Sequence, residues 1–365
     1  MPSELFIGLM SGTSLDGVDS VIAEVADQHC QVLHQHFTPY PESLRDQLLL
    51  LHHPSHNELE LTALTANTLS RLYAENVSEL LALSNTPASQ IQAIGCHGQT
   101  IRHRPELGFT LQIGNPALLA ELTGITTIAD FRSRDIAAGG HGAPLVPAFH
   151  AAMFSHPQLH RVVLNIGGIA NLSDLPPNGK VTGFDTGPGN MLLDAWIGLH
   201  QGLRYDVDGA WAASGVVLPE LLQTMLSHPY FQAAPPKSTG RDLFNLSWLE
   251  TLLQPGQYRP EDVQRTLLEL SAVSIASAVS QHCANVQELY VCGGGAYNGV
   301  LMQRLQQLLQ PATIQTSDVL GITVNTMEAA AFAWLARQAL YRLPGNLPDV
   351  TGAQGHRILG AVYAA

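Results

Sequence analysis

Three glycine-rich turns hold most of the residues in this sequence that could do chemistry. The first turn lies in residues 7–25 (IGLMSGTSLDGVDSVIAEV), where small residues and an Asp16-Gly17 pair separate two apolar runs. This pattern predicts a strand, a tight turn and a returning strand. Backbone amides and hydroxyls in such a turn can surround a phosphate. A plain β-hairpin closed by Asp-Gly explains the same letters and stays open as an alternative.

The other two turns lie in the second half of the chain. Residues 161–176 (RVVLNIGGIANLSDLP) repeat the layout of the first turn, and residues 286–309 place Gly293, Gly294 and Gly295 between an apolar strand and an amphipathic helix. Glycines allow a flat ligand to lie against the backbone, and a helix N-terminus favours an anion. The third turn is therefore a candidate cradle for an adenosine.

A fourth strand end carries the letters GFDTGPGN (residues 183–190). The glycines let the backbone approach a ligand, and the helix expected after them favours an anion. Asp185, at the strand end, can act as a base or a metal ligand. A helix cap would explain one of these residues but hardly all of them.

Polar side chains also follow two strands expected in the first half. His97, Gln99 and Thr100 follow residues 91–96, and the second group comprises Asp130, Arg132, Arg134 and Asp135. Strands of an α/β sheet present functional groups at their carboxyl ends, so these are candidate substrate contacts. A structural histidine in a turn and ion pairing within the second group are the alternatives. Glu328 opens a late helix, where it either compensates the helix dipole or binds a sugar hydroxyl.

Composition excludes several classes of protein. The chain has a formal net charge of −13 and no basic run, which argues against a nucleic-acid or anionic-membrane partner. Its only lysines are Lys180 and Lys237, and neither lies in a G-x-x-x-x-G-K-[ST] motif. Because Walker-type NTPases and protein kinases need a lysine on the nucleotide phosphates, both classes are excluded.

Cysteine and histidine positions give no strong metal signal. Cys30, Cys96, Cys283 and Cys292 form no C-x-x-C pair and are typical of buried, reduced thiols. Three histidines in residues 52–56 lack acidic or cysteine partners at ligand spacing, so a solvated loop is the better interpretation. The N-terminus does not resemble a signal peptide, and no apolar run approaches membrane-spanning length. We therefore expect a cytoplasmic protein.

The length of 365 residues predicts two domains. Because the turns in residues 5–25 and 161–176 echo one another, we expect the two halves to share one fold by duplication. The expected domains are residues 1–155, with the first phosphate loop, and residues 156–365, with the second phosphate loop and the adenosine loop.

The layout resembles the superfamily of hexokinase, actin and heat-shock chaperone ATPases, in which two phosphate loops and an adenosine loop close round ATP and a metal ion. More specifically, the sequence resembles the anhydro-N-acetylmuramic acid kinase family. The letters that carry the resemblance run through the chain in the same order: GLMSGTSLDGVD, CHGQT, ADFR, LNIGGIAN, GFDTGPGN and VCGGGAYN. The implied fold is α/β, with two duplicated ribonuclease H-like domains of the actin and hexokinase type and a nucleotide cleft between them.

The resemblance also implies a reaction. Such enzymes open 1,6-anhydro-N-acetylmuramic acid with water and phosphorylate O6, yielding N-acetylmuramic acid 6-phosphate and ADP in peptidoglycan recycling. Asp185 would be the general base that activates the water, with ATP and Mg²⁺ as cofactors. The ligands of the metal stay open, with Asp16, Asp19 and waters on Asp185 as candidates. A homodimer is also implied.

Carried over by position, the implied ATP contacts are Gly12, Thr13, Ser14, Leu15, Asp16, Gly17, Val18, Asp19, Gly168, Gly187, Gly189, Gly293, Gly294, Gly295 and Asn298. The implied sugar contacts are His97, Thr100, Asp130, Arg132 and Glu328.

Two other functions remain to be weighed. VCGGGAYNG with the later Asp318 imitates a dinucleotide-binding fingerprint, but only one such unit exists and it lies near the C-terminus. A non-enzymatic, actin-like or chaperone-like ATP-driven module is the second alternative, because fold alone does not set function.

Overall fold

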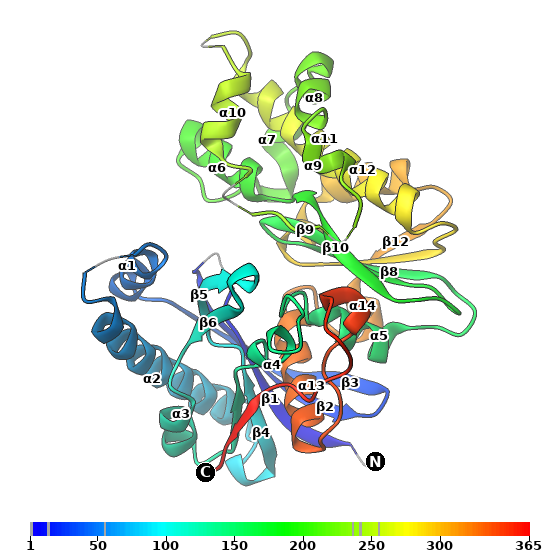
Figure 1. Cartoon of the computed structure of the whole chain (residues 1–365). Coiled ribbons are helices and arrows are strands. Elements are labelled where there is room, and N and C mark those ends of the chain that lie inside the picture. The colour runs from blue at the N-terminus through cyan, green and yellow to red at the C-terminus, as the bar shows by residue number, and fades with distance from the viewer. Residues whose placement is uncertain (1–2, 13–14, 55, 236, 241–242, 255) are drawn as a thin grey trace. The chain divides into compact units, whose positions relative to one another are not determined.

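The structure is a computed structural model that describes residues 3–12, 15–54, 56–235, 237–240, 243–254 and 256–365. The chain divides into two compact units, of which unit 1 comprises Met1–Met153 and Gly321–Ala365, and unit 2 comprises Phe154–Leu320. Each unit is built on a mixed β-sheet with packed helices (Figure 1).

The sheet of unit 1 has the strand order β13-β7-β4-β1-β2-β3. The strands are β1 (Glu4–Met10), β2 (Gly17–Ala26), β3 (His29–Pro39), β4 (Ile91–Cys96), β7 (Thr127–Ala129) and β13 (Ala361–Tyr363). Strands β1, β2 and β3 form an antiparallel meander, and β4 and β7 continue the sheet in parallel with β1. A separate antiparallel hairpin joins β5 (Gln99–Arg104) to β6 (Phe109–Ile113).

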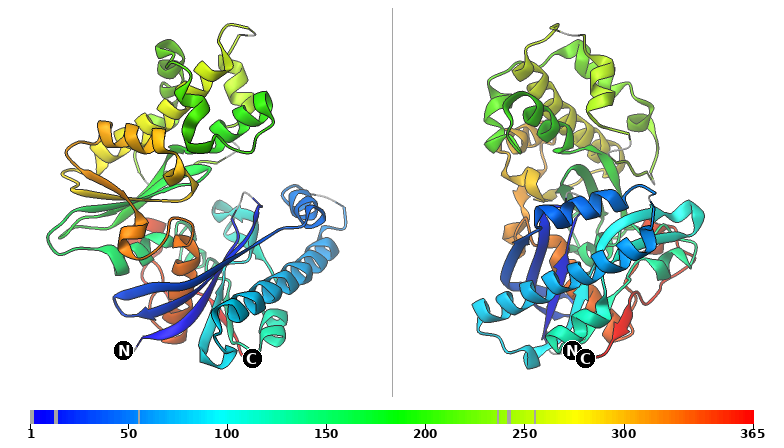
Figure 2. Two further views of the ribbon diagram at one scale, coloured as in Figure 1. Left: turned by 180° about the vertical axis from the view of Figure 1, so that it is seen from behind. Right: turned by 90° about the vertical axis from the view of Figure 1, so that its left-hand side faces the viewer.

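Helices lie on both faces of this sheet (Figures 1 and 2). The helices of unit 1 are α1 (Glu42–Leu51), α2 (Glu58–Ser84), α3 (Pro116–Thr123), α4 (Ser133–Ile136), α13 (Met327–Leu340) and α14 (Pro348–Thr351), and α5 (Val146–Phe154) leads into unit 2. Ile7 and Leu9 of β1 share an apolar cluster with Leu48 of α1 and Leu69 of α2. Because neighbouring residues of a strand point to opposite faces, Gly8 faces the other side, where α13 lies.

Helix α13 packs unusually close to the sheet, and two paired glycines permit it. Gly8 of β1 is the register partner of Gly95 of β4. A Cβ atom at Gly8 would lie 1.8 Å from the carbonyl oxygen of Ala329, and one at Gly95 would lie 2.0 Å from that of Phe332. Since no side chain fits in these gaps, the helix backbone rests directly on the strands. This contact positions Glu328 in the first turn of α13.

The sheet of unit 2 has the strand order β10-β9-β8-β11-β12. The strands are β8 (Arg161–Ile166), β9 (Ile169–Leu175), β10 (Thr182–Pro188), β11 (Glu288–Cys292) and β12 (Thr313–Thr316). Strands β8, β9 and β10 form an antiparallel meander, while β11 and β12 run parallel to β8.

The helices of unit 2 are α6 (Met191–Gln201), α7 (Ala210–Ala213), α8 (Pro219–Leu226), α9 (Pro229–Gln232), α10 (Leu246–Leu252), α11 (Pro260–His282) and α12 (Gly299–Leu308). Helix α11 is the central helix of the unit, and its small residues allow close packing. Leu267 and Ile275 of α11 share one apolar cluster with Val162 and Leu164 of β8 and with Leu301 of α12.

The two sheets repeat one topology. The order β3-β2-β1-β4-β7 in unit 1 matches the order β10-β9-β8-β11-β12 in unit 2, because each is an antiparallel meander followed by two strands parallel to its first strand. Unit 1 adds the antiparallel strand β13 at the edge of its sheet. Such a repeated order is the pattern expected of two ribonuclease H-like domains, so the predicted α/β fold with a duplication is confirmed. The expected nucleotide cleft between the domains stays a prediction.

The division of the chain differs from the expected domains at its C-terminal end. The expected boundary near residue 155 lies close to the change of unit after Met153, but Gly321–Ala365 returns to unit 1 instead of staying with residues 156–320. The reason is packing, because β13 pairs with β7 and α13 covers β1 and β4. The compact unit formed by contacts is Phe154–Leu320, whereas the expected second domain, residues 156–365, stays a prediction.

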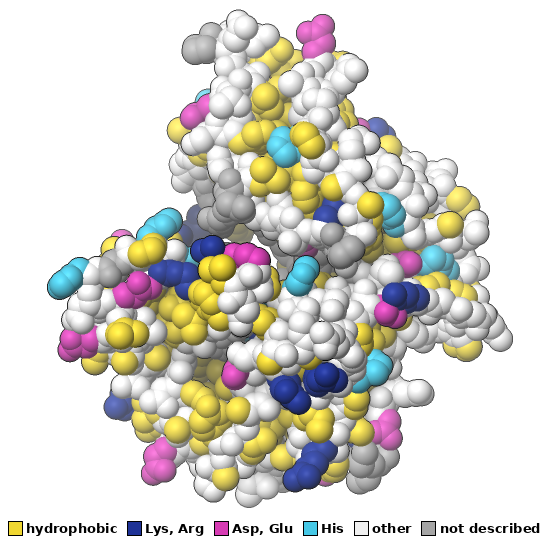
Figure 3. Space-filling view, viewed as in Figure 1, with side chains coloured by type: hydrophobic (Ala, Val, Ile, Leu, Met, Phe, Trp, Pro, Cys, Tyr) yellow, Lys and Arg dark blue, Asp and Glu magenta, His cyan; other side chains and the backbone are white. Residues whose placement is uncertain are grey.

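The surface shows mixed character on the face drawn in Figure 3. Lys and Arg side chains are spread over this face in small groups, with Asp, Glu and exposed apolar side chains between them. Among the described residues, no helix combines the length and apolarity that crossing a membrane requires.

The glycine contact under α13 predicts a cost for adding a methyl group. We expect Gly95→Ala to lower the free energy of unfolding by about 1–3 kcal/mol, because the new Cβ must displace the Phe332 carbonyl or the helix. Urea denaturation measures the change. Gly198→Ala in α6 is the matched control, since its Cβ would lie 3.5 Å from the nearest atom, the Leu203 carbonyl oxygen. Equal losses in both variants would contradict the proposed contact.

Candidate functional site

Asp185 is the fourth of the seven residues of β10, at the register shift between Asp185 and Gly187, and is half-buried. Its carboxylate oxygen Oδ2 accepts a hydrogen bond from the Thr239 amide at 3.0 Å. Burial raises the pKa of Asp185 to about 6, and the hydrogen bond from Thr239 opposes this rise. A carboxylate with this pKa is still mainly ionised at pH 7 and is a stronger base than an exposed aspartate.

The backbone of Asp185 is also fixed by the residues around Thr239. The Tyr230 hydroxyl donates to the Asp185 carbonyl oxygen at 2.6 Å, and the Asp185 amide donates to the Lys237 carbonyl oxygen at 3.1 Å. Tyr230 and Thr239 were not among the candidate residues that the sequence indicated. The isolated Lys237 beside a small, polar stretch was the one local signal available.

The second glycine turn is closed by the start of α6. The amides of Gly189 and Met191 donate to the Gly168 carbonyl at 2.8 and 3.1 Å, and the Asn190 amide donates to the Gly167 carbonyl at 2.8 Å. These three amides already have protein partners, so this helix start offers fewer free donors to an anion than the sequence suggested. Gly189 is required sterically, because a Cβ there would lie 2.4 Å from the Gly167 oxygen.

The third glycine turn combines packing positions with one open position. Cβ atoms at Gly293 and Gly295 would lie 2.3 Å from Asn165 Oδ1 and from Ile166 Cγ2, respectively. Gly294 is exposed and has only Asn190 Nδ2 nearby, at 3.7 Å from its would-be Cβ. Gly294 is thus the glycine of this turn that leaves room for a flat ligand.

Asn298, expected beside an adenosine, has a structural contact in unit 2. Its side-chain oxygen accepts a hydrogen bond from the Leu301 amide at 3.0 Å and caps the start of α12. In the same region the Asp208 carboxylate accepts from the Gly299 amide at 2.8 Å. Asp208 therefore supports the start of α12.

In unit 1, the first glycine turn joins β1 to β2 as the sequence predicted. Thr13 and Ser14, two of the expected ATP contacts, lie outside the described residues. Gly12 and Leu15 flank them, and Leu15 has a left-handed φ of 60°. Asp16 is exposed, whereas Gly17 and Val18 are buried at the start of β2. The described part of the turn thus fits either a phosphate loop or a β-hairpin.

Hydrogen bonds tie the first glycine turn to the strand end at residues 97–99. The Ser11 hydroxyl donates to the Gly98 carbonyl at 2.9 Å, and Gln99 Nε2 donates to the Gly12 carbonyl at 3.0 Å. The hydroxyls of Tyr40 and Tyr73 complete this buried network. The Gln99 side chain therefore helps to fix the position of the first glycine turn.

His97 and Arg132 come together as one pair. The Nε and Nη2 atoms of Arg132 lie 3.1 and 2.9 Å from Nε2 of His97. Burial and the neighbouring guanidinium lower the pKa of His97 to about 3, so the ring is neutral at physiological pH and accepts the hydrogen bond. Burial lowers the pKa of Arg132 to about 10, which leaves it charged, and Glu328 and Asp135 act against that lowering.

Asp19 and Glu328 are the acidic members of the site in unit 1. Burial, then the charges of Glu328 and Asp16, raise the pKa of Asp19 to about 7. Burial also raises the pKa of Glu328, although the positive charge of Arg132 opposes this. Four predicted residues therefore interact in succession: Asp19 with Glu328, Glu328 with Arg132, and Arg132 with His97.

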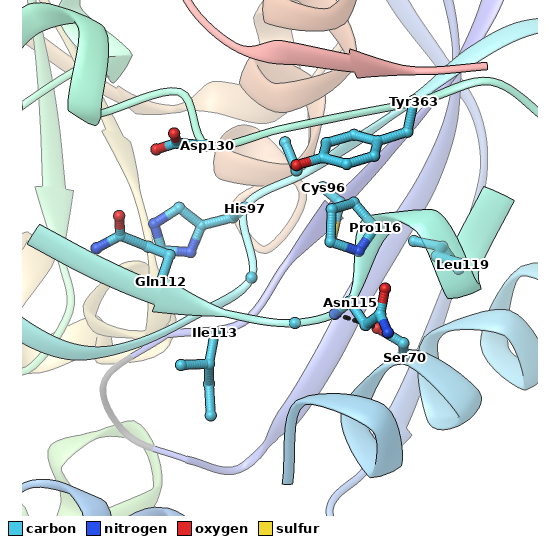
Figure 4. Close-up of a pocket in the computed structure, with 13 residues that line it drawn as sticks. Ser70, Cys96, His97, Gln112, Ile113, Asn115, Pro116, Leu119, Asp130 and Tyr363 are labelled. Atoms are coloured by element: carbon cyan, nitrogen blue, oxygen red, sulfur yellow. Dashed lines mark hydrogen bonds between the residues drawn. The ribbon is translucent and has the colours of Figure 1, made fainter. Parts of the chain in front are cut away.

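A pocket of about 130 Å³ lies beside His97 in unit 1 (Figure 4). His97, Gln112 and Asp130 line one side of it, and Asn115, Pro116, Leu119 and Tyr363 line the other. Asp130 is exposed and has a left-handed φ of 57°. Thr100 does not line the pocket, and its hydroxyl accepts a hydrogen bond from Gln112 at 3.1 Å.

Asp135, expected in an arginine fork or an ion pair, has a structural role instead. Its fully buried carboxylate accepts hydrogen bonds from the Gly142 amide, Asn346 Nδ2 and the Thr351 hydroxyl at 2.7–2.8 Å. The carboxylate thereby holds the C-terminal segment against the loop after α4.

The candidate residues fall into two sets. Asp185 and the second and third glycine turns belong to unit 2, whereas the first turn and the group around Arg132 belong to unit 1. Among the described residues, no three His, Cys, Asp or Glu side chains are grouped as metal ligands would be.

Comparison with known proteins adds independent evidence. The family model described as anhydro-N-acetylmuramic acid kinase matches residues 4–365. A relative of that name from Thiobacillus denitrificans is 58% identical over 366 residues, covering 100% of this chain and 98% of the relative. A relative of the same name from Nitrosospira multiformis is 53% identical, covering 100% of this chain and 100% of the relative. Another from Nitrosomonas europaea is also 53% identical, covering 99% of each.

Solved structures give weaker matches. An activator of 2-hydroxyisocaproyl-CoA dehydratase from Clostridium difficile has a TM-score of 0.45 and 11% identity, covering 93% of this chain and 98% of that one. A ROK family glucokinase from Streptomyces griseus has a TM-score of 0.44 and 12% identity, covering 92% and 99%. The fold assignment therefore rests on the strand orders given above. The family match spans nearly the whole sequence, and the chain belongs to the anhydro-N-acetylmuramic acid kinase family.

Proposed function

We propose that this protein is an ATP-dependent sugar kinase that opens 1,6-anhydro-N-acetylmuramic acid with water and phosphorylates O6. The products are N-acetylmuramic acid 6-phosphate and ADP, which places the reaction in peptidoglycan recycling. Family membership supports the substrate. The observation that carries the chemistry is Asp185, a half-buried carboxylate on β10 whose pKa of about 6 suits a general base. A non-enzymatic ATP-driven module has no comparable support.

In the proposed reaction, Asp185 accepts a proton from a water molecule as the water oxygen attacks C1 of the sugar. The bond between C1 and O6 breaks, O6 attacks the γ-phosphorus of ATP, and ADP leaves. The sequence supplies no Walker lysine for this transfer. Stabilisation of the phosphates must therefore come from backbone amides, hydroxyls and a metal ion.

The first turn, residues 12–19, is the proposed phosphate loop, and Gly168, Gly187, Gly189, Gly293, Gly294, Gly295 and Asn298 are the proposed remainder of the ATP site. Within the third turn, the exposed Gly294 is the best supported contact for the adenosine, since Asn298 is engaged as a helix cap. His97, Thr100, Asp130, Arg132 and Glu328 are the proposed sugar contacts. The charged Arg132 gives this group a cation for the carboxylate of an acidic sugar.

We propose that the Mg²⁺ ion of the reaction would lie beside the acidic residues of unit 1. Asp19 carries a pKa raised by burial and by Glu328, and a divalent cation beside these oxygens would relieve that repulsion. We propose Asp19 as a residue that holds the ion, directly or through water. When bound, the ion would neutralise charge on the ATP phosphates. We also propose that the protein is cytoplasmic, which is supported by its four buried, free cysteines. A homodimer is proposed from the family resemblance alone.

Removing the base tests the function directly. We expect wild-type protein to release ADP from Mg-ATP only with the anhydro sugar, and Asp185→Asn to lower kcat by about a hundredfold or more, because the amide accepts no proton. A coupled ADP assay and mass spectrometry of the product measure this. Asp318→Asn, at an exposed position in unit 2, is the control and should stay near wild type. If the protein releases ADP at the same rate with and without the anhydro sugar, the kinase assignment is overturned.

The pKa of Asp185 also predicts a pH profile. The base acts only when ionised, so we expect kcat/KM to fall about tenfold per pH unit as the pH drops below about 6. His97 cannot cause this limb, because its pKa of about 3 lies too low. Asp19, with a pKa of about 7, is the competing source. If the fall of kcat/KM at low pH disappears in Asp19→Asn, the ionisation belongs to Asp19, and its assignment to Asp185 is refuted.

A further inference from the structure

Residues 229–240, hereafter the 229–240 segment, lie against Asp185 in unit 2, with Pro236 outside the described residues. Three hydrogen bonds join the segment to this one aspartate. The Thr239 amide binds the carboxylate, the Lys237 carbonyl binds the Asp185 amide, and the Tyr230 hydroxyl binds the Asp185 carbonyl. The segment therefore fixes both the backbone and the side chain of the proposed base.

The start of the 229–240 segment is itself anchored by an aromatic cluster. The ring of Phe244 lies 5.6 Å from that of Tyr230, 5.4 Å from that of Phe231 and 5.1 Å from that of Trp248, measured between centroids. Phe244 is fully buried, so these contacts lie in the apolar core. The packing of its ring on Phe244 therefore fixes the position from which Tyr230 contacts Asp185.

Two further contacts hold the segment close to β10. A Cβ at Gly187 would lie 2.8 Å from Phe231 Cε1, so the glycine allows the ring to approach the strand two residues beyond Asp185. Lys237 Nζ donates to the Tyr230 carbonyl at 3.2 Å and lies 4.8 Å from the centre of the Tyr230 ring. The lysine thereby ties the two halves of the segment together.

The amide of Thr239 contacts only one of the two carboxylate oxygens, Oδ2. A hydrogen bond from a fixed amide restricts rotation of the carboxylate and favours its ionised form. The hydroxyl of Thr239 has no such contact, since Oγ1 is buried without a hydrogen-bond partner among the described residues. The contribution of Thr239 to Asp185 therefore comes from its backbone, which a side-chain substitution leaves in place.

We propose that Thr239 is a positioning residue of the reaction: its backbone amide holds Oδ2 of Asp185, so that Oδ1 is presented to the water. This inference rests on the proposed function for its catalytic meaning. The ionisation of Asp185, however, is measurable whether or not the enzyme turns over.

Thr239→Pro removes the amide proton, and Thr239→Val is the matched control that keeps it. Loss of the hydrogen bond disfavours the charged form, so we expect the acid limb of kcat/KM in Thr239→Pro to move up by about one pH unit. The limb in Thr239→Val should stay at the wild-type pH. Coincident limbs in wild type and Thr239→Pro would overturn the proposal.

A second measurement separates this inference from the proposed function. Carbon-13 NMR of protein labelled at aspartate carboxyl groups, with Asp185→Asn to assign the signal, reports the pKa of Asp185 without substrate. We expect that pKa to rise by about one unit in Thr239→Pro and to be unchanged in Thr239→Val. If the pKa of Asp185 rises in Thr239→Pro but the wild type shows no sugar-dependent turnover, the proposed function is refuted and the role of Thr239 in holding Asp185 is supported. If the wild type turns over the sugar but the pKa of Asp185 does not rise in Thr239→Pro, the function is supported and the role of Thr239 is refuted.

Folding of the proline variant is checked by circular dichroism and thermal unfolding. If Thr239→Pro does not fold, incorporation of the α-hydroxy acid analogue of threonine at position 239 replaces the amide N–H with an ester oxygen and leaves the side chain intact. The same rise in the pKa of Asp185 and the same shift of the acid limb are then expected. An unchanged pKa in the ester variant would overturn the proposal.

Discussion

The direct contact between α13 and the β1–β4 strand pair is the constraint on which the site in unit 1 depends. Because Gly8 and Gly95 are register partners, the helix backbone lies against both strands at once. The first turn of α13 then brings Glu328 into the electrostatic field of Asp19 on β2 and of Arg132 after β7. A wider separation would weaken these interactions, since charge–charge energy falls with distance.

The two units use one strand order for different local chemistry. In unit 1, the turn after β1 is tied down by side chains, among them Ser11, Gln99 and the buried Tyr73. In unit 2, the turn after β8 is closed by backbone amides at the start of α6, which bind the carbonyls of Gly167 and Gly168. The duplication thus repeats the scaffold, while the donors left for a ligand differ between the turns.

The sequence was most informative where structure is local. Glycine turns and apolar runs predicted the strand–turn–strand units, and the echo between residues 5–25 and 161–176 predicted the duplication. The return of residues 321–365 to unit 1 depends on contacts with strands more than 190 residues earlier, which no local pattern encodes. Asn298 and Asp135 fitted binding roles by residue type. In the structure, however, Asn298 caps a helix, and the buried Asp135 carboxylate accepts a hydrogen bond from Asn346, and neither contact could be read from the sequence. Thr239 was missed because its contribution to Asp185 is a backbone amide, which every residue except proline carries.

The environment of Asp185 balances two opposing effects. Burial disfavours the charged carboxylate and makes it a stronger base, while the amide of Thr239 favours the charge. With burial alone, more of the carboxylate would be protonated at neutral pH and unable to accept a proton. With full exposure, it would be ionised but a weak base. The 229–240 segment therefore accounts for how one aspartate can be both ionised and basic at the pH where a general base must work.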